Sequence, residues 1–357
     1  MKGRRPRPLD DGDCGRLRVS LIINTTKLIK WQTSRVSIIK KCTVSAIKDA
    51  ASSLRSGNLV AFPTETVYGL GADAQNKDAV TKIYQVKGRP ADHPLIVHLS
   101  SIEHLDKWAR DIPNYAKALV RTFWPGPMTL ILPRTRLAKD FITGGQDNVG
   151  IRVPSHTVAF ALLKEFESQG GLGVAAPSAN RFGALSPTTA KDVQQELSKY
   201  LEPVDLILDG GPSLVGVEST IINCTQSVPT ILRPGAITQD MIDNLLGISV
   251  IPDPQNLGNQ IKASGLLESH YAPSAKVFLK GTPESGDGFI ALASFKTPTG
   301  AIRLASPVNN KDYAQILYQA LRLADSKKIG RVFVIPPEGL DIAVAINDRL
   351  IRCSFKN

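Results

Sequence analysis

Short apolar runs of strand length, separated by segments with helical periodicity, restrict the possible folds of this chain more than any other feature of its sequence. The runs lie at 59–62, 94–99, 128–132, 149–153, 173–176, 204–208, 219–223 and 230–232. Apolar residues with helical spacing occur near 47–54, 79–86, 102–122, 157–168 and 189–200. Continuous apolar strands that alternate with amphipathic helices are typical of a sheet covered by helices. The pattern therefore predicts an α/β or α+β fold with a twisted open sheet.

The character of the sequence changes near residue 247. Residues 251–259 are rich in Pro, Asn and Gly and have no apolar period, which is typical of a linker. Strand-like runs return at 276–279, 289–293 and 331–335, with helical patterns near 313–324 and 342–352. A chain of 357 residues also exceeds the roughly 250–300 residues at which single cores stop growing. We expect a large domain at 37–247, a linker at 248–274 and a small Rossmann-like α/β domain at 275–357.

The net charge of +11 raises the possibility of a nucleic-acid-binding protein. Residues 1–41 contain eleven Lys or Arg and three Asp, so they carry +8 of this charge, and the rest of the chain is nearly balanced. The apolar patch at 19–23 is too short for a secretory signal, and the acidic residues argue against a transit peptide. We expect residues 1–36 to be a basic, disordered leader, or sequence that precedes the true start of translation, rather than an RNA-binding arm.

Several classes of protein and of site are disfavoured by what the sequence lacks. No apolar run approaches the roughly 18 residues that a membrane-spanning helix needs. The four cysteines, Cys14, Cys42, Cys224 and Cys353, are scattered without a CxxC pair, which argues against a zinc site or a disulfide framework. This cysteine usage fits a reducing compartment, and we expect a cytoplasmic protein. Neither a P-loop nor a GxGxxG, GxSxG or HExxH motif occurs.

Polar residues follow several predicted strands, at the place where open α/β sheets bind ligands. The segment 63–71 places two threonines, a glutamate and glycines directly after a strand, and it can wrap a small polar ligand or form an ordinary turn. Lys87 and Arg89 near a helix end can clamp phosphates, or they can simply favour the helix dipole. Hydroxyl and amide side chains that could position a nucleotide occur in 176–180, at Ser186 and in 218–220, with Arg233 further on.

Arg152 lies inside an otherwise apolar run, and a buried arginine needs an anionic partner. That partner could be an internal carboxylate or the carboxylate of a ligand, and we favour the ligand. His98 closes another apolar strand, where a lone histidine is more often structural. Taken together, the basic positions on separate strands indicate a pocket for a nucleotide and a small carboxylate.

A series of motifs occurs in a fixed order between residues 63 and 237. They are PTETVYGLG, KGRP with PLIVH, WPGPMTLIL, VGIRVP, APSAN with SPTTA, ILDGG with ESTII, and ILRPGAI. In this order they resemble the threonylcarbamoyl-AMP synthase family, whose YrdC-like fold surrounds a central ligand cavity. SHYAP at 269–273 and AINDRL at 345–350 extend the resemblance to the long, two-domain form. The resemblance covers about 40–354 and leaves the basic leader unmatched.

The resemblance implies a nucleotidyltransferase that condenses L-threonine, bicarbonate or carbon dioxide, and ATP. The products would be threonylcarbamoyl-AMP and pyrophosphate. It further implies Mg²⁺ bound with ATP, no tightly bound organic cofactor and no association with a membrane. A partner transferase complex would then pass the threonylcarbamoyl group to an adenosine beside the anticodon of tRNA, so that contact of this chain with RNA would be weak or indirect.

The resemblance also implies roles for individual residues. The threonine-binding residues would be Thr66, His98, Arg152, Ala176 and Ser219. The ATP-binding residues would be Arg89, His93, Asn148, Ser178, Ser186, Arg233 and Tyr271. Lys87, Arg89 and Asn180 would serve the phosphates or the carbamate as catalytic residues, and no metal ligand is implied. His93 departs from the family, which commonly has Asn there, and Tyr271 on the linker would cover the nucleotide.

Two other functions remain as alternatives. A double-stranded-RNA-binding module would use the leader and a basic pocket, but the body of the chain has no basic stripe. A carbamoyl-transfer module of the kind found in hydrogenase-maturation proteins would carry acylphosphatase and zinc-finger segments, and the cysteine pattern for these is missing.

Overall fold

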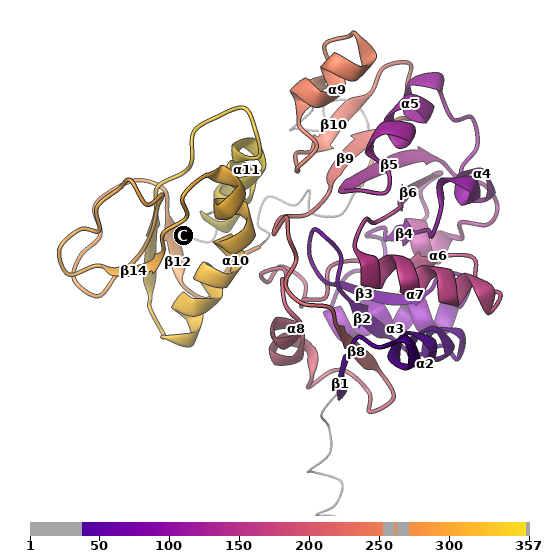
Figure 1. The fold of residues 1–357 in the computed structure, drawn as a ribbon, viewed down its shortest axis with the longest axis horizontal. Coiled ribbons are helices and arrows are strands. Elements are labelled where there is room, and N and C mark those ends of the chain that lie inside the picture. The colour runs from indigo at the N-terminus through magenta and orange to yellow at the C-terminus, as the bar shows by residue number, and fades with distance from the viewer. Residues whose placement is uncertain (1–37, 253–260, 263–270, 355–357) are drawn as a thin grey trace, which may run out of the picture. The chain divides into compact units, whose positions relative to one another are not determined.

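The computed structural model describes residues 38–252, 261–262 and 271–354. The predicted leader, residues 1–36, lies outside the described residues, as do 253–260 and 263–270 within the predicted linker. Figure 1 shows two sheets with helices packed against them, a large one formed by 38–252 and a small one formed by 276–334. This architecture confirms the predicted mixed α/β fold, with a large twisted sheet and a second, smaller α/β unit.

The large sheet mixes parallel and antiparallel pairs. Its strand order is β1-β8-β2-β3-β7-β4-β6-β5-β9-β10-β11. The strands are β1 (Ile38–Lys41), β2 (Val60–Phe62), β3 (Gly69–Asp73), β4 (Ile96–His98), β5 (Met128–Pro133), β6 (Asn148–Arg152), β7 (Val174–Ala175), β8 (Leu206–Asp209), β9 (Thr220–Asn223), β10 (Thr230–Arg233) and β11 (Ile251–Pro252). The parallel pairs include β4 with β6 and β5 with β9, so segments far apart in the sequence end side by side.

Helices cover the large sheet and bury its apolar side chains. They are α2 (Val44–Arg55), α3 (Lys77–Lys87), the 3₁₀ turn η1 (Ile102–His104), α4 (Leu105–Trp108), α5 (Asn114–Phe123), α6 (Asp140–Thr143), α7 (Thr157–Ser168), α8 (Ala190–Leu197) and α9 (Gln239–Leu246). α2 and α7 share one core cluster with β2 and β8, whereas α3 and α5 pack into the main core. Capping side chains fix where several of these helices begin, for example Thr189, which forms a capping box with Asp192 at the start of α8.

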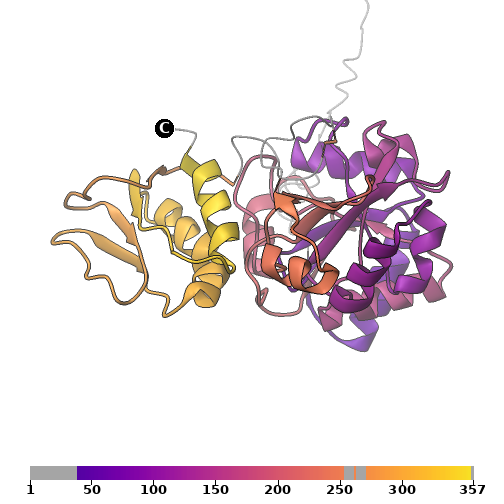
Figure 2. The same cartoon turned by 90° about the horizontal axis from the view of Figure 1, so that it is seen from above.

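The small unit has four parallel strands in the order β12-β15-β13-β14. They are β12 (Lys276–Phe278), β13 (Gly288–Ile290), β14 (Ile302–Ala305) and β15 (Arg331–Val334). Helices α10 (Asn310–Ser326) and α11 (Ala343–Ser354) pack against this sheet (Figure 2). The core of the unit also includes Val67, Leu185 and Val217, which belong to loops of the large sheet.

The structure differs from the sequence pattern at 102–122 and within 63–71. The helix expected at 102–122 is divided into η1, α4 and α5. Asp111 has a left-handed backbone (φ 51°), and a helix that comes from the preceding residues cannot continue through Pro113, which instead precedes α5. The segment 63–71 is a polar loop only as far as Tyr68, and β3 then pairs antiparallel with β2. The loop is therefore held at both ends by strands.

Candidate active site

A cavity lies where loops from several strands of the large sheet meet. Its free volume is about 50 Å³, room for only a few water molecules. The sequence-predicted site residues that line it are Thr66, Arg89, His98, Arg152, Ala176, Ser178, Ser219, Arg233 and Tyr271. The predicted positions for threonine and most of those for ATP therefore meet at one place.

β4 and β6 bring two of these side chains together. His98 and Arg152 are register partners at the carboxyl ends of these neighbouring parallel strands. Side chains at paired positions lie on the same face of a sheet. Arg152 Nη1 donates a hydrogen bond to Thr66 Oγ1 (2.9 Å), and its Nε donates to the carbonyl of Gly126 (3.2 Å).

Arg152 also has an internal carboxylate partner. Its guanidinium lies 2.7 Å from Oε1 of Glu65, and both side chains are buried. Burial opposes ionisation of Glu65, but the charge of Arg152 and its hydrogen bond hold the pKa of this carboxyl below its ordinary value. Of the two partners that the sequence left open for Arg152, the favoured ligand carboxylate is thus not needed to explain its burial, because Glu65 supplies an internal anion.

His98 is neutral in this environment. Burial, followed by the nearby charge of Arg152, lowers its pKa to about 3. Its Nδ1 lies 3.3 Å from the carbonyl of Ile96, and its ring meets that of Phe62 edge-on. The imidazole can thus offer a hydrogen bond to a ligand without adding a positive charge.

Arg233 is fixed against the loop before β9. Its Nε and Nη2 donate to the carbonyl of Ser219 (3.1 and 3.0 Å), and Nη2 also reaches Ser219 Oγ (3.2 Å). Ser219 Oγ is in turn hydrogen-bonded to Thr129 Oγ1 (2.8 Å) on β5. The register of β5 and β9 therefore sets the position of Ser219, and Ser219 sets that of Arg233.

Lys87 lies outside the residues that line the cavity, but it holds one of its loops. Its Nζ donates to the carbonyls of Ser178 and Asn180, and it is buried. Burial, and then the nearby Arg89, lower the pKa of this amine well below its ordinary value. The Asn180 amide donates to the carbonyls of Arg181 and Ala184 (2.8 Å each), which closes the same loop. Both residues therefore shape the segment that presents Ser178.

Arg89 and Ser186 lie nearer to the cavity. Arg89 Nη2 donates to the carbonyl of Pro94 (3.0 Å), and burial lowers its pKa to about 10, so that it remains a cation at neutral pH. Ser186 is fully buried, and its hydroxyl contributes to lowering the pKa of Glu218.

Three predicted ATP contacts do not line this cavity: Ser186, which reaches it only through Glu218, and also His93 and Asn148. His93 is half-buried, and its ring packs edge-on against Phe182 at 5.3 Å between centroids. Asn148 lines a separate small pocket together with Gln146 and Lys262. This small pocket shares Ile96 with the main cavity.

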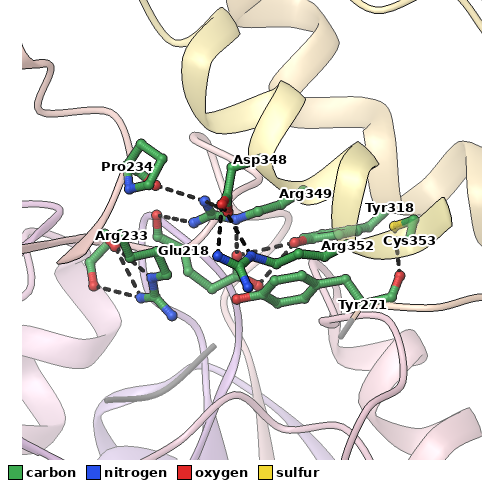
Figure 3. A network of polar contacts seen from close by, with 10 residues as sticks. Glu218, Arg233, Pro234, Tyr271, Tyr318, Asp348, Arg349, Arg352 and Cys353 are labelled. Atoms are coloured by element: carbon green, nitrogen blue, oxygen red, sulfur yellow. Dashed lines mark hydrogen bonds and ion pairs between the residues drawn. The ribbon is translucent and has the colours of Figure 1, made fainter. Parts of the chain in front are cut away.

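Glu218 was noted in the sequence only as part of a polar segment, yet it lines the cavity and anchors a buried network (Figure 3). Its carboxylate lies 2.9 Å from Nε of Arg349 on α11 and accepts hydrogen bonds from the hydroxyl of Tyr318 (3.0 and 3.1 Å). Arg349 was likewise not predicted as a site residue. The signal was present, because Arg349 falls on the apolar face of α11 with Ile346, Leu350 and Cys353.

Tyr271 is fixed by the same helix. Its ring is almost fully buried and its carbonyl accepts a hydrogen bond from Cys353 Sγ (2.8 Å). The Arg349 guanidinium lies 5.6 Å from the centre of its ring, and the ring of Tyr318 lies at 5.9 Å. The backbone of Tyr271 is in the left-handed region (φ 61°).

Neither a metal-binding cluster nor a membrane-spanning helix occurs in the described part of the chain. It contains no group of three or more His, Cys, Asp or Glu side chains that could hold a metal ion. Of its helices, none combines the length and apolar character needed to cross a membrane.

Comparisons with known proteins agree with this arrangement. A family model for the Sua5, YciO and YrdC proteins, described as telomere recombination, matches residues 52–235. A second model, described as the C-terminal domain of threonylcarbamoyl-AMP synthase, matches residues 237–354. The threonylcarbamoyl-AMP synthase of Pyrococcus abyssi is 44% identical over 86% of this chain and 94% of its own length. The Bacillus subtilis synthase is 38% identical over 86% of this chain and 92% of its own length.

The fold also matches a solved structure over most of both chains. The crystal structure of P. abyssi Sua5 in complex with L-threonine has a TM-score of 0.80 and 36% sequence identity. The match covers 89% of this chain and 98% of that chain.

Proposed function

The chain belongs to the threonylcarbamoyl-AMP synthase family, in its long two-domain form, and we propose how the residues of its cavity carry out the family's reaction. It is a nucleotidyltransferase that condenses L-threonine, bicarbonate or carbon dioxide, and ATP to threonylcarbamoyl-AMP and pyrophosphate. The product serves threonylcarbamoyl modification of an adenosine next to the anticodon of tRNA. The observation that carries our mechanism is the convergence on one cavity of the residues implied for both substrates.

Arg152 faces the threonine carboxylate in this mechanism. Its guanidinium is held in place by Glu65 and Thr66, so little side-chain freedom is lost when threonine binds. Neutral His98 adds a hydrogen bond without a second cation. Ser219 and the backbone at Ala176 complete the threonine pocket, which both residues line.

Arg89 and Arg233 neutralise the phosphates of ATP, with Ser178 and Ser186 as neutral hydrogen-bonding partners. Both arginines are buried, and charge interactions are strongest where water is excluded. Lys87 and Asn180 act on this step through the loop that they hold in shape. His93 and Asn148 serve the nucleotide in this proposal from positions beside the cavity.

The chemistry asks for positioning more than for a strong acid or base. The threonine amine attacks carbon dioxide and loses a proton, which gives a carbamate. A carbamate oxygen then attacks the α-phosphorus of ATP, and the bond to the departing pyrophosphate breaks. Such steps are accelerated mainly by alignment of the reactants and by neutralisation of charge. Buried arginines around one cavity provide both.

We propose Mg²⁺ as the metal that accompanies ATP. Two carboxylates lie at this site, Glu218 in the cavity wall and Glu65 against Arg152, and both already bind arginines. The described residues therefore offer no protein cage, and the ion would be held by phosphate oxygens and water, as Mg²⁺ commonly is. When bound, it neutralises phosphate charge. The reaction needs no tightly bound organic cofactor.

The product would next be used by a tRNA-modifying transferase complex, and contact of this chain with RNA would be weak or indirect. We also place the enzyme in the cytoplasm. The free thiols of Cys42, Cys224 and Cys353 are consistent with a reducing compartment.

The reaction can be tested directly with the purified full chain. Incubation with ATP, Mg²⁺, radiolabelled bicarbonate and L-threonine should yield a labelled adenylate and pyrophosphate, and omission of threonine should abolish both. Arg89→Gln should raise KM for ATP at least tenfold, whereas Arg121→Gln, exposed on α5, should change neither KM. Absence of product from the folded wild-type enzyme with all substrates present would refute the proposed function.

We further propose that Tyr271 acts as a lid. It lines the cavity and is buried, and a nucleotide bound in the cavity would lie against its side chain. An adenylated carbamate hydrolyses readily, and enclosure would protect it. Tyr271→Ala should therefore weaken ATP binding and lower the yield of adenylate per ATP consumed. Unchanged ATP affinity and yield would sink this idea.

A further inference from the structure

A buried ion cluster links α11 to the edge of the cavity (Figure 3). Its members are Glu218, Arg349 and Tyr318, joined by one ion pair at 2.9 Å and two hydrogen bonds at 3.0 and 3.1 Å. Arg349 Nη1 donates further to the carbonyl of Pro234 (2.7 Å) and to Asp348 (2.8 Å). Arg349 is 0% exposed, and so complete a burial of an arginine requires all of these partners.

Glu218 is the member that touches the site. It is 5% exposed and lines the same cavity as Arg89 and Arg233, which we assign to the phosphates of ATP. A carboxylate there has two possible harmful effects on ATP. It repels the phosphates, and it competes with them for Arg233. The strength of both effects depends on how fully another cation neutralises Glu218.

The electrostatics identify Arg349 as that cation. Burial opposes ionisation of Glu218, yet the nearby Arg349 and, to a smaller extent, Arg233 lower its pKa to about 2. Glu218 is thus ionised and lies within the influence of both arginines. The guanidinium of Arg233 donates to Ser219, whereas Arg349 makes the ion pair with Glu218.

We propose that Arg349 is a positioning residue for ATP: it holds and neutralises Glu218, and so leaves Arg233 directed at the nucleotide phosphates. This inference rests on the proposed function, and it gives α11 a role in the reaction. The same helix fixes Tyr271 through Cys353, one turn further along. Residues on one face of α11 therefore neutralise Glu218 and also hold Tyr271 in the cavity wall.

The competing explanation is that the cluster only attaches α11 to the rest of the protein. A matched contact of that kind exists. Arg322 on α10 pairs with Glu196 (3.4 Å) and donates to the carbonyl of Leu185, and neither Arg322 nor Glu196 lines the cavity. Arg322→Met therefore serves as the control that removes an attachment of α10 without removing a charge from the cavity wall.

The test compares Arg349→Met, Glu218→Gln and the double variant in the full chain. Steady-state kinetics give kcat and KM for ATP, calorimetry gives threonine affinity without ATP, and thermal unfolding reports stability. Arg349→Met should raise KM for ATP at least tenfold and change threonine affinity less than threefold. The double variant should bring KM for ATP to within about threefold of wild type, because no carboxylate remains to capture Arg233. Arg322→Met should lower Tm and leave KM for ATP unchanged.

The outcomes separate the two explanations. If Arg349→Met changes only Tm, or if the double variant fails to recover ATP affinity while folded, the proposal is wrong. If Arg349→Met does not fold, the double variant and Tyr318→Phe decide the question. Tyr318→Phe removes the hydroxyl that donates to both carboxylate oxygens of Glu218, without removing a charge, and it should raise KM for ATP two- to fivefold. An unchanged KM would overturn the proposal. Failure of the wild-type enzyme to form threonylcarbamoyl-AMP would instead refute the proposed function.

Discussion

His98 illustrates how burial changes what a single side chain can do at this site. Its pKa of about 3 lies below that of an exposed histidine, so it stays neutral in the folded protein down to acidic pH, whereas the unfolded chain binds a proton below about pH 6.5. Stability linked to His98 is therefore present above that pH and is lost as the pH falls toward the folded pKa.

The first prediction follows from this difference. Between pH 7.5 and 5.5, His98 should account for about 1.4 kcal/mol of lost unfolding free energy, since one pKa unit corresponds to about 1.4 kcal/mol. Urea unfolding of wild type and of His98→Asn at both pH values measures the effect as a difference. The pKa values of His93 and His156 are also lowered, but both residues are present in the two proteins, so their contributions to the pH dependence cancel in the difference. Equal pH dependence in the two proteins would contradict the assignment of a neutral His98.

The pair of Arg152 and Glu65 gives a second prediction. Arg152→Met leaves a buried carboxylate without its ion-pair partner, which costs about 3–5 kcal/mol in buried pairs. Threonine binding should be lost as well. Glu65→Gln combined with Arg152→Met should recover much of the stability without recovering threonine binding.

The control for this pair is Lys40→Met, which removes the exposed ion pair with Asp49 and should cost less than about 1 kcal/mol. Urea unfolding and threonine calorimetry on all three variants separate stability from binding. If the double variant bound threonine as wild type does, Arg152 would not face the substrate.

Sequence reasoning reached many residues of the site but not their pairings. Hydroxyl and amide groups after strands, and an arginine within a strand, are visible as exceptions in an apolar pattern. Glu65 as the partner of Arg152 could not be predicted, because the loop from 63 to 68 folds over β6 through contacts between distant segments. Arg349 was visible as a charge on the apolar face of α11, but nothing in the sequence connects it to Glu218, which lies 131 residues earlier.

At the level of elements, the apolar pattern missed β1, β3, β11 and β14, and β3 is the one that adjoins the site. Its sequence, GLGAD, contains two glycines, and glycine weakens a strand prediction. Packing explains them. A Cβ at Gly71 would lie 2.8 Å from side-chain atoms of both Phe62 and Val174. Neighbouring strands approach closely here, whereas β5 contains no glycine and its continuous apolar run was predictable.

Gly71 therefore provides a third prediction. Gly71→Ala should reduce the unfolding free energy by about 1–3 kcal/mol through overpacking. It should also weaken threonine binding, because β3 continues directly from the loop that carries Thr66. The matched control is Gly330→Ala, where a Cβ meets nothing within 4 Å. A stable Gly71→Ala enzyme with unchanged threonine affinity would show that β3 tolerates the methyl group by shifting.

For the molecule as a whole, the distribution of charge separates the leader from the reaction. The formal charge of +11 is carried mainly by residues 1–41, whereas the arginines of the cavity and its network lie between 89 and 349. Deletion of residues 2–36 should therefore leave kcat and both KM values within about twofold of wild type. Kinetics of the shortened and full chains in the same buffer check this. A large rise in KM for ATP would instead assign the leader to the active site.

The left-handed backbone of Tyr271 has a consequence for how often the enzyme can turn over. A non-glycine residue in that region destabilises the folded chain by about 1–2 kcal/mol. Here the contacts of the Tyr271 ring and carbonyl with α11 offset that destabilisation. If Tyr271 moves aside, this strain is relieved while those contacts are lost. In the lid mechanism that we propose, the two terms partly cancel, which would bring the enclosed and open conformations closer in free energy. The same residue can then shelter a short-lived intermediate and still allow pyrophosphate and product to depart in each cycle.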